Sequence, residues 1–355
     1  MSLEEMRKKI DETDEKIVRL IAERIRESQS IGDEKKKNSK RVEDAAREEM
    51  VLAHIKAIAR EEKLDEKEIQ NIYRQIIKSS KGIQGIEVAF QGETGAYSEE
   101  AAFQYFGHSI IPKPCDTFDT VFEVVENDEA PFGVVPIENS LEGSISRVYD
   151  LLLNSNLKVF GEMELRIVHC LIANQHATLD TIKKVYSHPQ ALGQSQLFLR
   201  HLGCEIISTY DTAGSVKMIK EQNIMDGAAI ASARAAEIYS MKILAREIED
   251  TPNNFTRFFI LSRKDSPPTG MDKTSIVFSV QHKPGALYAA IKEFADCKIN
   301  LTKIESRPTR QKAWEYNFYL DFEGHHEDEM VKDALDRLAN HSLFLKVLGS
   351  YPRAT

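Results

Sequence analysis

The first 81 residues carry apolar positions with the spacing of an amphipathic helix. Leu, Met and Ile recur three, four or seven positions apart from Leu3 to about Lys37, which predicts one very long helix. A second helix is predicted from about Val42 to Glu62, and a third begins at Asp65, which forms a capping box with Glu68. A helix of about 35 residues is roughly 50 Å long, so two shorter helices cannot cover it. The segment therefore predicts a homo-oligomer, at least a dimer, in which a second copy packs on the uncovered half.

From Ile86 onward the pattern changes to short apolar runs that alternate with amphipathic stretches. The predicted strands are Ile86–Phe90, Phe132–Pro136, Val168–Ala173, Val185–Ser187, Ala228–Ile230 and Phe258–Leu261. The stretches with helical spacing include Ser98–Phe106, Gln190–Leu202 and Ala213–Glu221. This alternation predicts an α/β domain whose ligand site lies where strands lead into helices. A linker rich in Pro and Ser, Ser266–Gly270, ends the region.

Residues 273–353 predict the order strand, helix, strand, strand, helix, strand. The segments are Ser275–Gln281, Gly285–Asp296, Ile299–Arg307, Ala313–Phe322, Glu327–Asn340 and Phe344–Leu348. This order is that of a ferredoxin-like βαββαβ unit. The chain is thus predicted to hold an all-helical domain at 1–84, an α/β domain at 85–265 and an α+β domain at 272–355.

Charge and cysteine content narrow the class of protein. The chain has 47 basic and 56 acidic residues, a net charge of −9, which disfavours nucleic acid as a partner. Residues 1–81 hold 20 basic and 19 acidic residues, so the acidic excess lies in the remainder and marks a boundary. No apolar run approaches the roughly 20 residues that span a bilayer, and the first residues lack the pattern of a signal peptide. The four cysteines form no CxxC pair, which favours buried thiols in a cytoplasmic protein over a metal site or disulfides.

Charged residues of the N-terminal helices share faces. Arg24 and Lys35 are 11 residues apart, about three helical turns, and Asp44, Arg47 and Glu48 follow the spacing of one face on the second helix. One interpretation is a solvated surface with ordinary i,i+4 pairs. Arg7 lies 28 residues from Lys35, or about 42 Å along the helix. The two serve one site only if Arg7 comes from the other subunit of an antiparallel pair.

The order Met6-Arg-Lys-Lys-Ile10, Glu23-Arg24, Ile31-Gly32, Lys35, Val42-Glu-Asp44, Arg47-Glu48 and Ile76-Ile77 resembles the all-helical chorismate mutase family. The resemblance implies that the two carboxylates of chorismate are held by Arg7 of the partner subunit, Arg24 and Lys35. It implies donors to the ether oxygen at Lys35 and Gln84, a cluster near the ring hydroxyl at Asp44, Arg47 and Glu48, and a further pocket position at Ser80. The catalytic residues are then Lys35, Glu48 and Gln84. A Claisen rearrangement needs a held conformer and donors to the ether oxygen rather than an acid, base or nucleophile.

Polar clusters at strand ends mark the α/β domain. Gly92-Glu-Thr-Gly-Ala-Tyr-Ser98 opens a helix with backbone N–H groups that suit an anion, although many α/β proteins turn in this way. It matches neither GxGxxG nor a P-loop, which disfavours a dinucleotide or ATP. Uncharged donors in four more clusters predict a polar, anionic ligand: Pro136-Ile-Glu-Asn-Ser140 with Gly143-Ser144, Ser187-His-Pro-Gln190 with Gln194, Asp211-Thr-Ala213, and Asn254-Phe-Thr-Arg-Phe258. His188 is also explained as a residue that orders the turn before Pro189.

In order and spacing these clusters resemble the prephenate dehydratase family from about Ile86 to Arg263. That family has two α/β lobes with the active site between them. The resemblance implies that Thr256 assists departure of the ring hydroxyl of prephenate. It implies a substrate site made by Glu138, Asn139, Ser140, Ser187, Gln194, Thr256 and Arg257. Loss of CO2 and water forms an aromatic ring, so modest stabilisation of the leaving hydroxyl suffices, and no cofactor or metal is expected.

Two short motifs lie in the predicted βαββαβ unit. Pro284-Gly-Ala-Leu287 stands where the first strand meets the first helix, and Glu305-Ser-Arg-Pro308 follows the second strand. Together they resemble the ACT regulatory domains attached to prephenate dehydratases. The resemblance implies allosteric inhibition by L-phenylalanine, bound between paired domains at Gly285, Ala286, Leu287, Glu305, Ser306 and Arg307. The alternative is a domain that only promotes dimerisation.

The three resemblances occur in one order and cover nearly the whole chain. We therefore expect a bifunctional enzyme of phenylalanine biosynthesis that acts on chorismate and prephenate, with no nucleic-acid or membrane partner. One alternative is a monofunctional prephenate dehydratase with a helical dimerisation arm, which the intact charged set of the helices disfavours. Another is a two-lobed amino-acid-binding protein without catalysis, which the full setting of Thr256 disfavours. A prephenate dehydrogenase would need a dinucleotide fingerprint, which the sequence lacks.

Overall fold

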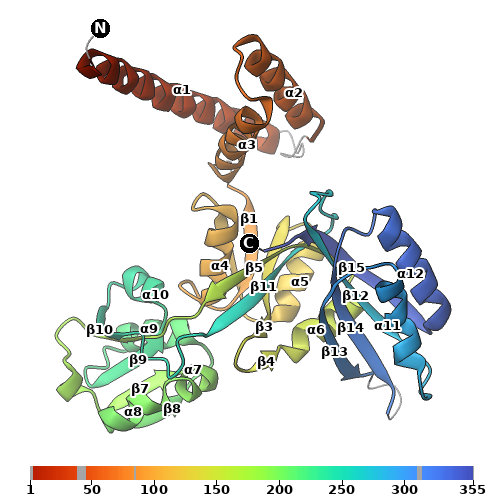
Figure 1. Ribbon diagram of the computed structural model, residues 1–355. Coiled ribbons are helices and arrows are strands. Elements are labelled where there is room, and N and C mark those ends of the chain that lie inside the picture. The colour runs from red at the N-terminus through yellow and green to blue at the C-terminus, as the bar shows by residue number, and fades with distance from the viewer. Residues whose placement is uncertain (1–2, 38–44, 84, 310–313, 355) are drawn as a thin grey trace. The chain divides into compact units, whose positions relative to one another are not determined.

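The computed structural model describes residues 3–37, 45–83, 85–309 and 314–354; at residue 3 and in 29–37, 45–49 and 78–83 it describes the backbone alone. It divides into two compact units. The first comprises Met1–Glu87 with Phe106–Ile111, and the second Val88–Tyr105 with Pro112–Thr355. The first unit is mainly helical, and the second contains three β-sheets (Figure 1). None of the described helices is both long enough and apolar enough to cross a membrane.

Three helices make up most of the first unit: α1 (Leu3–Lys37), α2 (Ala45–Glu61) and α3 (Glu66–Ile83). The Asp65 carboxylate caps α3, because its Oδ1 accepts from the backbone N–H of Lys67 at 2.8 Å and of Glu68 at 2.9 Å. Helix α3 packs against both α1 and α2. The three helices predicted for this segment are confirmed, and the expected first residues of the second helix lie outside the described residues.

Helix α1 leaves large apolar side chains uncovered within its unit. Met6, Ile10, Ile17 and Leu20 share one face of the helix by their spacing, and each is at least 45% exposed. An exposed contiguous apolar surface of this kind usually marks a contact with another protein chain.

The first sheet of the second unit has the strand order β2-β1-β3-β11-β5, with β4 paired to β3. Strand β1 runs parallel to β3, whereas β11 is antiparallel to both β3 and β5. Its strands are β1 (Glu87–Gln91), β2 (Ile111–Cys115), β3 (Phe132–Asn139), β4 (Gly143–Ser144), β5 (Lys158–Arg166) and β11 (Phe255–Ser262). Its helices are α4 (Tyr97–Phe106), α5 (Phe118–Glu126) and α6 (Ser146–Asn154). This sheet and its helices form the first lobe.

The second sheet has the order β10-β6-β9-β7-β8 and forms a second lobe with its own core. Its strands are β6 (Cys170–Ala173), β7 (Lys184–Ser187), β8 (Glu205–Ser208), β9 (Gly227–Ala231) and β10 (Lys242–Arg246). Its helices are η1 (Leu179–Thr181), α7 (Pro189–Gly193), α8 (Gln196–Leu202), α9 (Thr212–Glu221) and α10 (Ala233–Ile238). The chain enters this lobe after β5 and returns to the first lobe with β11, so two connections join the lobes.

The third sheet has the order β13-β14-β12-β15, with two helices on one face (Figure 1). Its elements are β12 (Asp272–Ser279), α11 (Ala286–Asp296), β13 (Leu301–Pro308), β14 (Tyr316–Glu323), α12 (Glu329–His341) and β15 (Phe344–Pro352). The predicted βαββαβ order is confirmed. We refer to this part as the C-terminal domain.

The C-terminal domain shares a hydrophobic core with the first lobe. Val277, Tyr319, Leu348 and Tyr351 are buried in the same cluster as the side chains beneath β1, β3 and β11. Full burial of a large apolar side chain contributes about 1.5–3 kcal/mol. The free face of the C-terminal sheet therefore packs on the first lobe, and its opposite face packs on α11 and α12.

The predicted helix Gln190–Leu202 is wrong in one respect, because the structure divides it into α7 and α8. Helix α7 ends at Gly193, with Gln194 as its C-cap. Helix α8 then begins with the backbone N–H groups of Gln196 and Leu197, which donate to the Asp250 carboxylate. An acceptor at a helix N-terminus satisfies donors that have no partner inside the helix. Asp250 lies far along the chain, so local periodicity does not reveal the break.

Gly349 is expected to be intolerant of any side chain. A Cβ atom there would lie 2.3 Å from the backbone oxygen of Val159, where β15 crosses β5. We predict that Gly349→Ala lowers the free energy of unfolding by about 1–3 kcal/mol, the usual cost of overpacking. Denaturant unfolding measures this, with Gly193→Ala as the control, since that Cβ would meet nothing within 4 Å. Equal stability of the two variants would contradict the tight crossing.

Candidate active site

A cavity of about 360 Å³ lies between the two lobes of the second unit. The first lobe contributes strand ends and the start of α4, and the second lobe contributes the starts of α7 and α9. The residues around it are Gln91, Ala96, Tyr97, Ser98, Phe118, Pro136, Asn139, Ile145, Ile167, His169, His188, Gln190, Ala191, Gln194, Tyr210, Asp211, Thr212, Thr256 and Phe258. A concave site between lobes with a few convergent polar groups is the usual form of a small-molecule site.

The N-terminus of α4 opens on the cavity, which Ala96, Tyr97 and Ser98 line there. The start of α9 also lies at the cavity, but the Asp211 carboxylate already caps it and accepts from the N–H of Gly214 at 2.7 Å. The free N–H groups and the dipole of a helix favour anions at this end. The cavity therefore suits a ligand with negative charge.

The glycines of the turn before α4 allow the lobes to approach each other. Gly95 has φ +95°, and a Cβ atom there would lie 2.9 Å from the Cα atom of Ala235 in the second lobe. The Gly95 carbonyl accepts from the hydroxyl of Ser232 at 2.8 Å. Glycine is thus required here both for the backbone conformation and for the close contact.

Asn139 and Thr256 face the cavity side by side, although 117 positions separate them. They are register partners on β3 and β11, and Nδ2 of Asn139 lies 3.0 Å from Oγ1 of Thr256. Oδ1 of Asn139 accepts from the backbone N–H groups of Leu141 at 3.0 Å and Glu142 at 3.1 Å. These two donors fix the amide, so its Nδ2 must be the group that donates to Thr256. The Thr256 hydroxyl accepts this bond, and no other described residue accepts its own proton, which is therefore available to donate into the cavity.

The orientation of the Asn139 amide also determines the orientation of the buried side chains beyond it. We call the connected residues the polar chain: Asn139, Asn254, Gln194, His169 and Tyr97. Nδ2 of Asn139 also donates to Oδ1 of Asn254 at 2.8 Å, and Nδ2 of Asn254 then donates to Oε1 of Gln194 at 2.8 Å. Oε1 of Gln194 lies 3.0 Å from Nε2 of His169, so the imidazole must donate its Nε2–H. Nδ1 of a neutral His169 is then an acceptor, and the hydroxyl of Tyr97 lies 2.8 Å from it.

Gln194 presents an unused donor at the cavity. Its Oε1 is engaged by Asn254 and His169, while its Nε2 is buried and has no hydrogen-bond partner among the described residues. A buried donor without a partner costs about 1–3 kcal/mol. An acceptor on a bound ligand would remove this cost.

Burial shifts the protonation of three groups that line the cavity. It lowers the pKa of His169, against a smaller opposing effect of the Gln194 hydrogen bond. It raises the pKa of Tyr97 well above the ordinary value of a phenol, and raises the pKa of Asp211 although the Gly214 N–H opposes that shift. His169 and Tyr97 are therefore neutral at physiological pH. Among the described residues no cluster of His, Cys, Asp or Glu has the arrangement of a metal site.

Three family models match the chain in sequence order. They are Chorismate mutase type II over residues 6–85, Prephenate dehydratase over 88–266 and ACT domain over 274–340. The bifunctional chorismate mutase/prephenate dehydratase of Stutzerimonas stutzeri is 39% identical over 360 residues, which cover 99% of this chain and 98% of that protein. The protein of the same description from Aquifex aeolicus (strain VF5) is 40% identical over 359 residues, with the same coverage. The chain belongs to the family of bifunctional chorismate mutases/prephenate dehydratases.

A solved structure agrees with this assignment. Prephenate dehydratase from Arthrobacter aurescens, crystallised in complex with L-Phe, aligns with a TM-score of 0.70 at 32% identity. The alignment covers 76% of this chain and 90% of that chain.

The structure brings three of the seven predicted dehydratase residues to the cavity: Asn139, Gln194 and Thr256. Ser187 is fully buried and donates to the carbonyl of Ile230 at 2.7 Å. Ser140 is exposed and donates to the carbonyl of Asn253 at 3.0 Å. Neither serine lines the cavity. Both contribute to the backbone arrangement around the residues that do.

Glu138 and Arg257 also do not line the cavity. Glu138 directly precedes the cavity residue Asn139 in β3, and Arg257 directly follows Thr256 in β11. Because successive side chains of a strand point to opposite faces of the sheet, Glu138 and Arg257 point away from the cavity. There both side chains meet the C-terminal domain. His188 does line the cavity, and its Nδ1 accepts from the N–H of Gln190 at 3.3 Å, which orders the turn.

Sequence reasoning missed three members of the polar chain: Tyr97, His169 and Asn254. Tyr97 and Asn254 lie inside motifs already recognised at strand ends, so their neighbours gave a signal. His169 lies between β5 and β6, where no motif surrounds it. Only the packing of the two lobes places it beside Gln194.

The structure describes two of the predicted mutase side chains, Arg7 and Arg24, both on α1. The backbone of Lys35 is in α1, that of Arg47 and Glu48 in α2, and that of Ser80 in α3. Asp44 and Gln84 lie outside the described residues.

The predicted effector residues fall into two groups. Ala286 and Leu287, next to Gly285, line a hollow of about 110 Å³ at the start of α11. Glu305 and Arg307 point instead to the first lobe, where Arg307 donates to the hydroxyl of Ser146 at 2.9 Å. Ser306, between them, is exposed.

The depressed pKa of His169 predicts loss of stability in acid. Below about pH 6.5, the ordinary pKa of histidine, this residue binds a proton in the unfolded chain, whereas the folded site resists protonation. The stability that a neutral His169 contributes is therefore present above that pH and is lost as the pH falls through the lower folded pKa. We expect the thermal midpoint to fall less in His169→Gln than in the wild type between about pH 7.5 and about pH 5.5. The exposed His176→Gln is the matched control. Identical pH profiles for all three proteins would contradict a neutral buried imidazole.

Proposed function

We propose that this chain converts chorismate to phenylpyruvate in two steps under control by L-phenylalanine. The helical segment rearranges chorismate to prephenate, and the cavity of the second unit removes CO2 and water from prephenate. The order of the three family matches and the full-length relatives support this function. The observation that carries the dehydratase step is the orientation of Thr256, whose hydroxyl proton is left free by the donor Asn139.

In the dehydratase step the ring carboxylate of prephenate leaves as CO2. The electron pair of the broken C–C bond enters the ring, and the C–O bond to the ring hydroxyl breaks as the ring becomes aromatic. The departing hydroxide takes a proton and leaves as water. We assign to Thr256 the hydrogen bond to this departing oxygen, because charge develops there in the transition state.

The remaining polar groups bind and orient the substrate. Prephenate carries two carboxylates, and the N-terminus of α4 suits one of them. The free Nε2 of Gln194 is a donor for a carboxylate or carbonyl oxygen of the substrate. Neutral His169 and Tyr97 hold Gln194 in the orientation that presents this donor.

For the mutase step we propose the charged set of the helices as the substrate site. Arg24, Lys35, Asp44, Arg47, Glu48, Ser80 and Gln84 come from one chain. Arg7 and Arg24 are 17 residues apart on α1, or about 25 Å, so Arg7 serves this site from a second copy. The exposed apolar residues of α1 support a homodimer formed through this helix.

For L-phenylalanine we propose the hollow beside Gly285, Ala286 and Leu287. Its apolar and aromatic lining suits a phenyl ring. Glu305 and Arg307 of β13 point to the first lobe instead of the hollow, so we assign to them the contact between this domain and that lobe. The structure of a relative in complex with L-Phe supports this class of effector.

One assay tests both reactions. Purified protein with chorismate should form phenylpyruvate, and L-phenylalanine should reduce its formation. Thr256→Val keeps the shape but lacks the hydroxyl, so we expect chorismate to be consumed at the wild-type rate while prephenate accumulates. The loss of dehydratase kcat should be about 100-fold or more, and Thr256→Ser, which keeps a hydroxyl, is the control.

The alternative outcomes separate the two steps. Turnover of added prephenate without turnover of chorismate would leave the helical segment as a dimerisation arm. Loss of both activities in Thr256→Val would contradict separate sites. Full dehydratase activity in Thr256→Val would exclude the assigned role of its hydroxyl.

Filling the hollow should weaken effector binding. In Ala286→Leu the larger side chain occupies the space assigned to the phenyl ring, so calorimetry should give a dissociation constant for L-phenylalanine raised by about tenfold or more, equivalent to ~1.4 kcal/mol. Ala295→Leu makes the same change at an exposed position of α11 and should leave the affinity unchanged. Unchanged affinity in Ala286→Leu would rule out this hollow as the site.

A further inference from the structure

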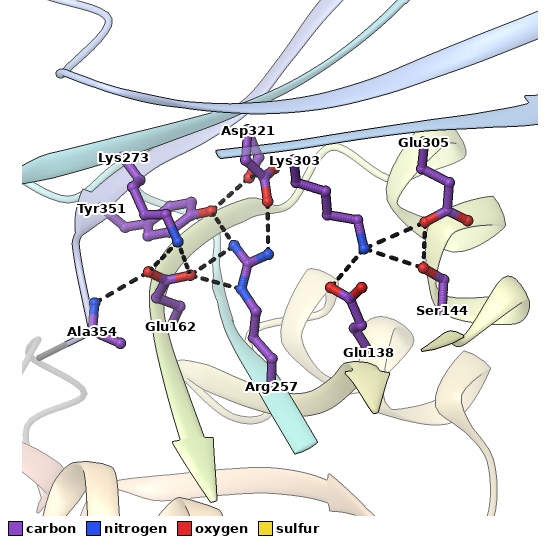
Figure 2. A network of polar contacts seen from close by, with 11 residues as sticks. Glu138, Ser144, Glu162, Arg257, Lys273, Lys303, Glu305, Asp321, Tyr351 and Ala354 are labelled. Carbon is purple, nitrogen blue, oxygen red and sulfur yellow. Dashed lines mark hydrogen bonds and ion pairs between the residues drawn. The ribbon is translucent and has the colours of Figure 1, made fainter. Parts of the chain in front are cut away.

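Strands β3 and β11 carry different chemistry on their two faces. On one face the register partners Asn139 and Thr256 line the cavity. On the other face the register partners Glu138 and Arg257 point to the C-terminal domain (Figure 2). Glu138 and Arg257, which touch the C-terminal domain, are therefore adjacent in the chain to the cavity residues Asn139 and Thr256.

Arg257 is held by three side chains at once. Its guanidinium donates to the carboxylate of Glu162 on β5 at 2.7 Å and to that of Asp321 on β14 at 2.7 Å (Figure 2). It also donates to the hydroxyl of Tyr351 on β15 at 3.1 Å. The side chains of Arg257, Glu162 and Asp321 are only 11%, 2% and 8% exposed. Two of the three partners belong to the C-terminal domain.

The charges of this cluster balance. Lys273 of β12 adds a second cation, 2.9 Å from Oε1 of Glu162, so two cations face the two carboxylates Glu162 and Asp321. The neighbouring phenol and carboxylates outweigh the effect of burial and raise the pKa of Arg257, so it stays charged. Removal of one partner from a buried ion pair leaves an uncompensated charge, which is strongly unfavourable. The cluster thus resists displacement of β14 relative to β11.

Glu138 takes part in a second cluster against the edge strand of the C-terminal sheet. Nζ of Lys303 on β13 lies 2.6 Å from Oε2 of Glu138 and 3.1 Å from the hydroxyl of Ser144 on β4 (Figure 2). Glu305, also on β13, bonds to Ser144 and lies 3.3 Å from Lys303. The motif that contains Glu305 is therefore joined to β3 and β4 by direct polar contacts.

Strand β14 reaches from the effector hollow to the Arg257 cluster. Tyr316 and Phe318 line the hollow, and Asp321 lies three residues further along the same strand, a span of roughly 10 Å. A strand paired on both sides moves as a unit, so a shift at one end is transmitted to the other.

We propose that Arg257 and Glu138 are positioning residues through which the C-terminal domain sets the placement of Thr256 and Asn139. Charge-assisted hydrogen bonds are short and directional, so a small displacement of the C-terminal sheet breaks them or pulls β11 and β3 with it. A displacement of about 1 Å in a reacting group can lower a rate ~100-fold. This inference rests on the proposed dehydratase function and adds the route by which effector binding reaches the site.

Asp321→Asn tests the inference without touching the cavity or the hollow. The substitution keeps the shape and removes the charge that faces Arg257. We expect the dehydratase kcat to fall about tenfold or more with KM nearly unchanged, the mutase rate to stay at the wild-type level, and L-phenylalanine to bind with unchanged affinity in calorimetry. Maximal inhibition by L-phenylalanine should be reduced, which a merely structural role would not produce.

Asp333→Asn is the matched control. It makes the same chemical change in the same domain, at an exposed carboxylate paired with Arg337 on α12, and should leave kcat and inhibition unaltered. Glu138→Gln is a second test variant, at a half-exposed position. It tests the same inference if Asp321→Asn does not fold. Wild-type kcat together with full inhibition in the folded variant would overturn the inference. Absence of dehydratase activity from the wild-type protein would instead overturn the proposed function.

Discussion

The amide orientation of Asn139 is the constraint on which the arrangement of the cavity depends. Two backbone N–H groups after β3, those of Leu141 and Glu142, occupy its oxygen. Its nitrogen must then face Thr256 and Asn254. From this point each donor and acceptor is determined in turn, because an amide has one acceptor side and one donor side. A turn of backbone thereby decides that Thr256 keeps a free proton and that a free donor of Gln194 is available to the substrate.

The first sheet separates the reaction from its control by the alternation of side chains along β3 and β11. One face carries neutral hydrogen-bonding groups that stabilise developing charge, and the other carries Glu138 and Arg257 among opposite charges. Buried ion pairs, such as those on the face toward the C-terminal domain, add little to the free energy of unfolding compared with apolar side chains of similar volume. The shared core around Val277, Tyr319 and Leu348 already holds the C-terminal domain in place. The buried charges are thus better explained by the geometry they impose on the strands than by their contribution to the free energy of folding.

Much of the architecture follows from local pattern, and the exceptions have identifiable causes. The bounds of α1 and the βαββαβ order of the C-terminal domain agree with prediction because the apolar positions of each element recur at the period of a helix or a strand. Strand β5 was not predicted, since Gly161, Glu162 and Glu164 interrupt its apolar run. Glu162 is buried all the same, because Arg257 and Lys273 neutralise it. The helix break after Gln194 depends on Asp250, which no local signal connects to it.

The sequence by itself determined the order of the domains, the residue types available at each strand end and the family to which the motifs of Thr256 belong. It also determined that Glu138 and Asn139, like Arg257 and Thr256, point to opposite faces, because side chains alternate along a strand. Only the tertiary structure decided which face meets the cavity and which meets the C-terminal domain. That choice depends on the register of β11 with β3, across a bulge after Arg257, and on a second lobe inserted between them in the chain. Contacts between residues far apart in the chain leave no periodic trace in the sequence. His169 lies 25 positions from Gln194 and Arg257 lies 64 positions from Asp321, so neither contact is visible in the local pattern.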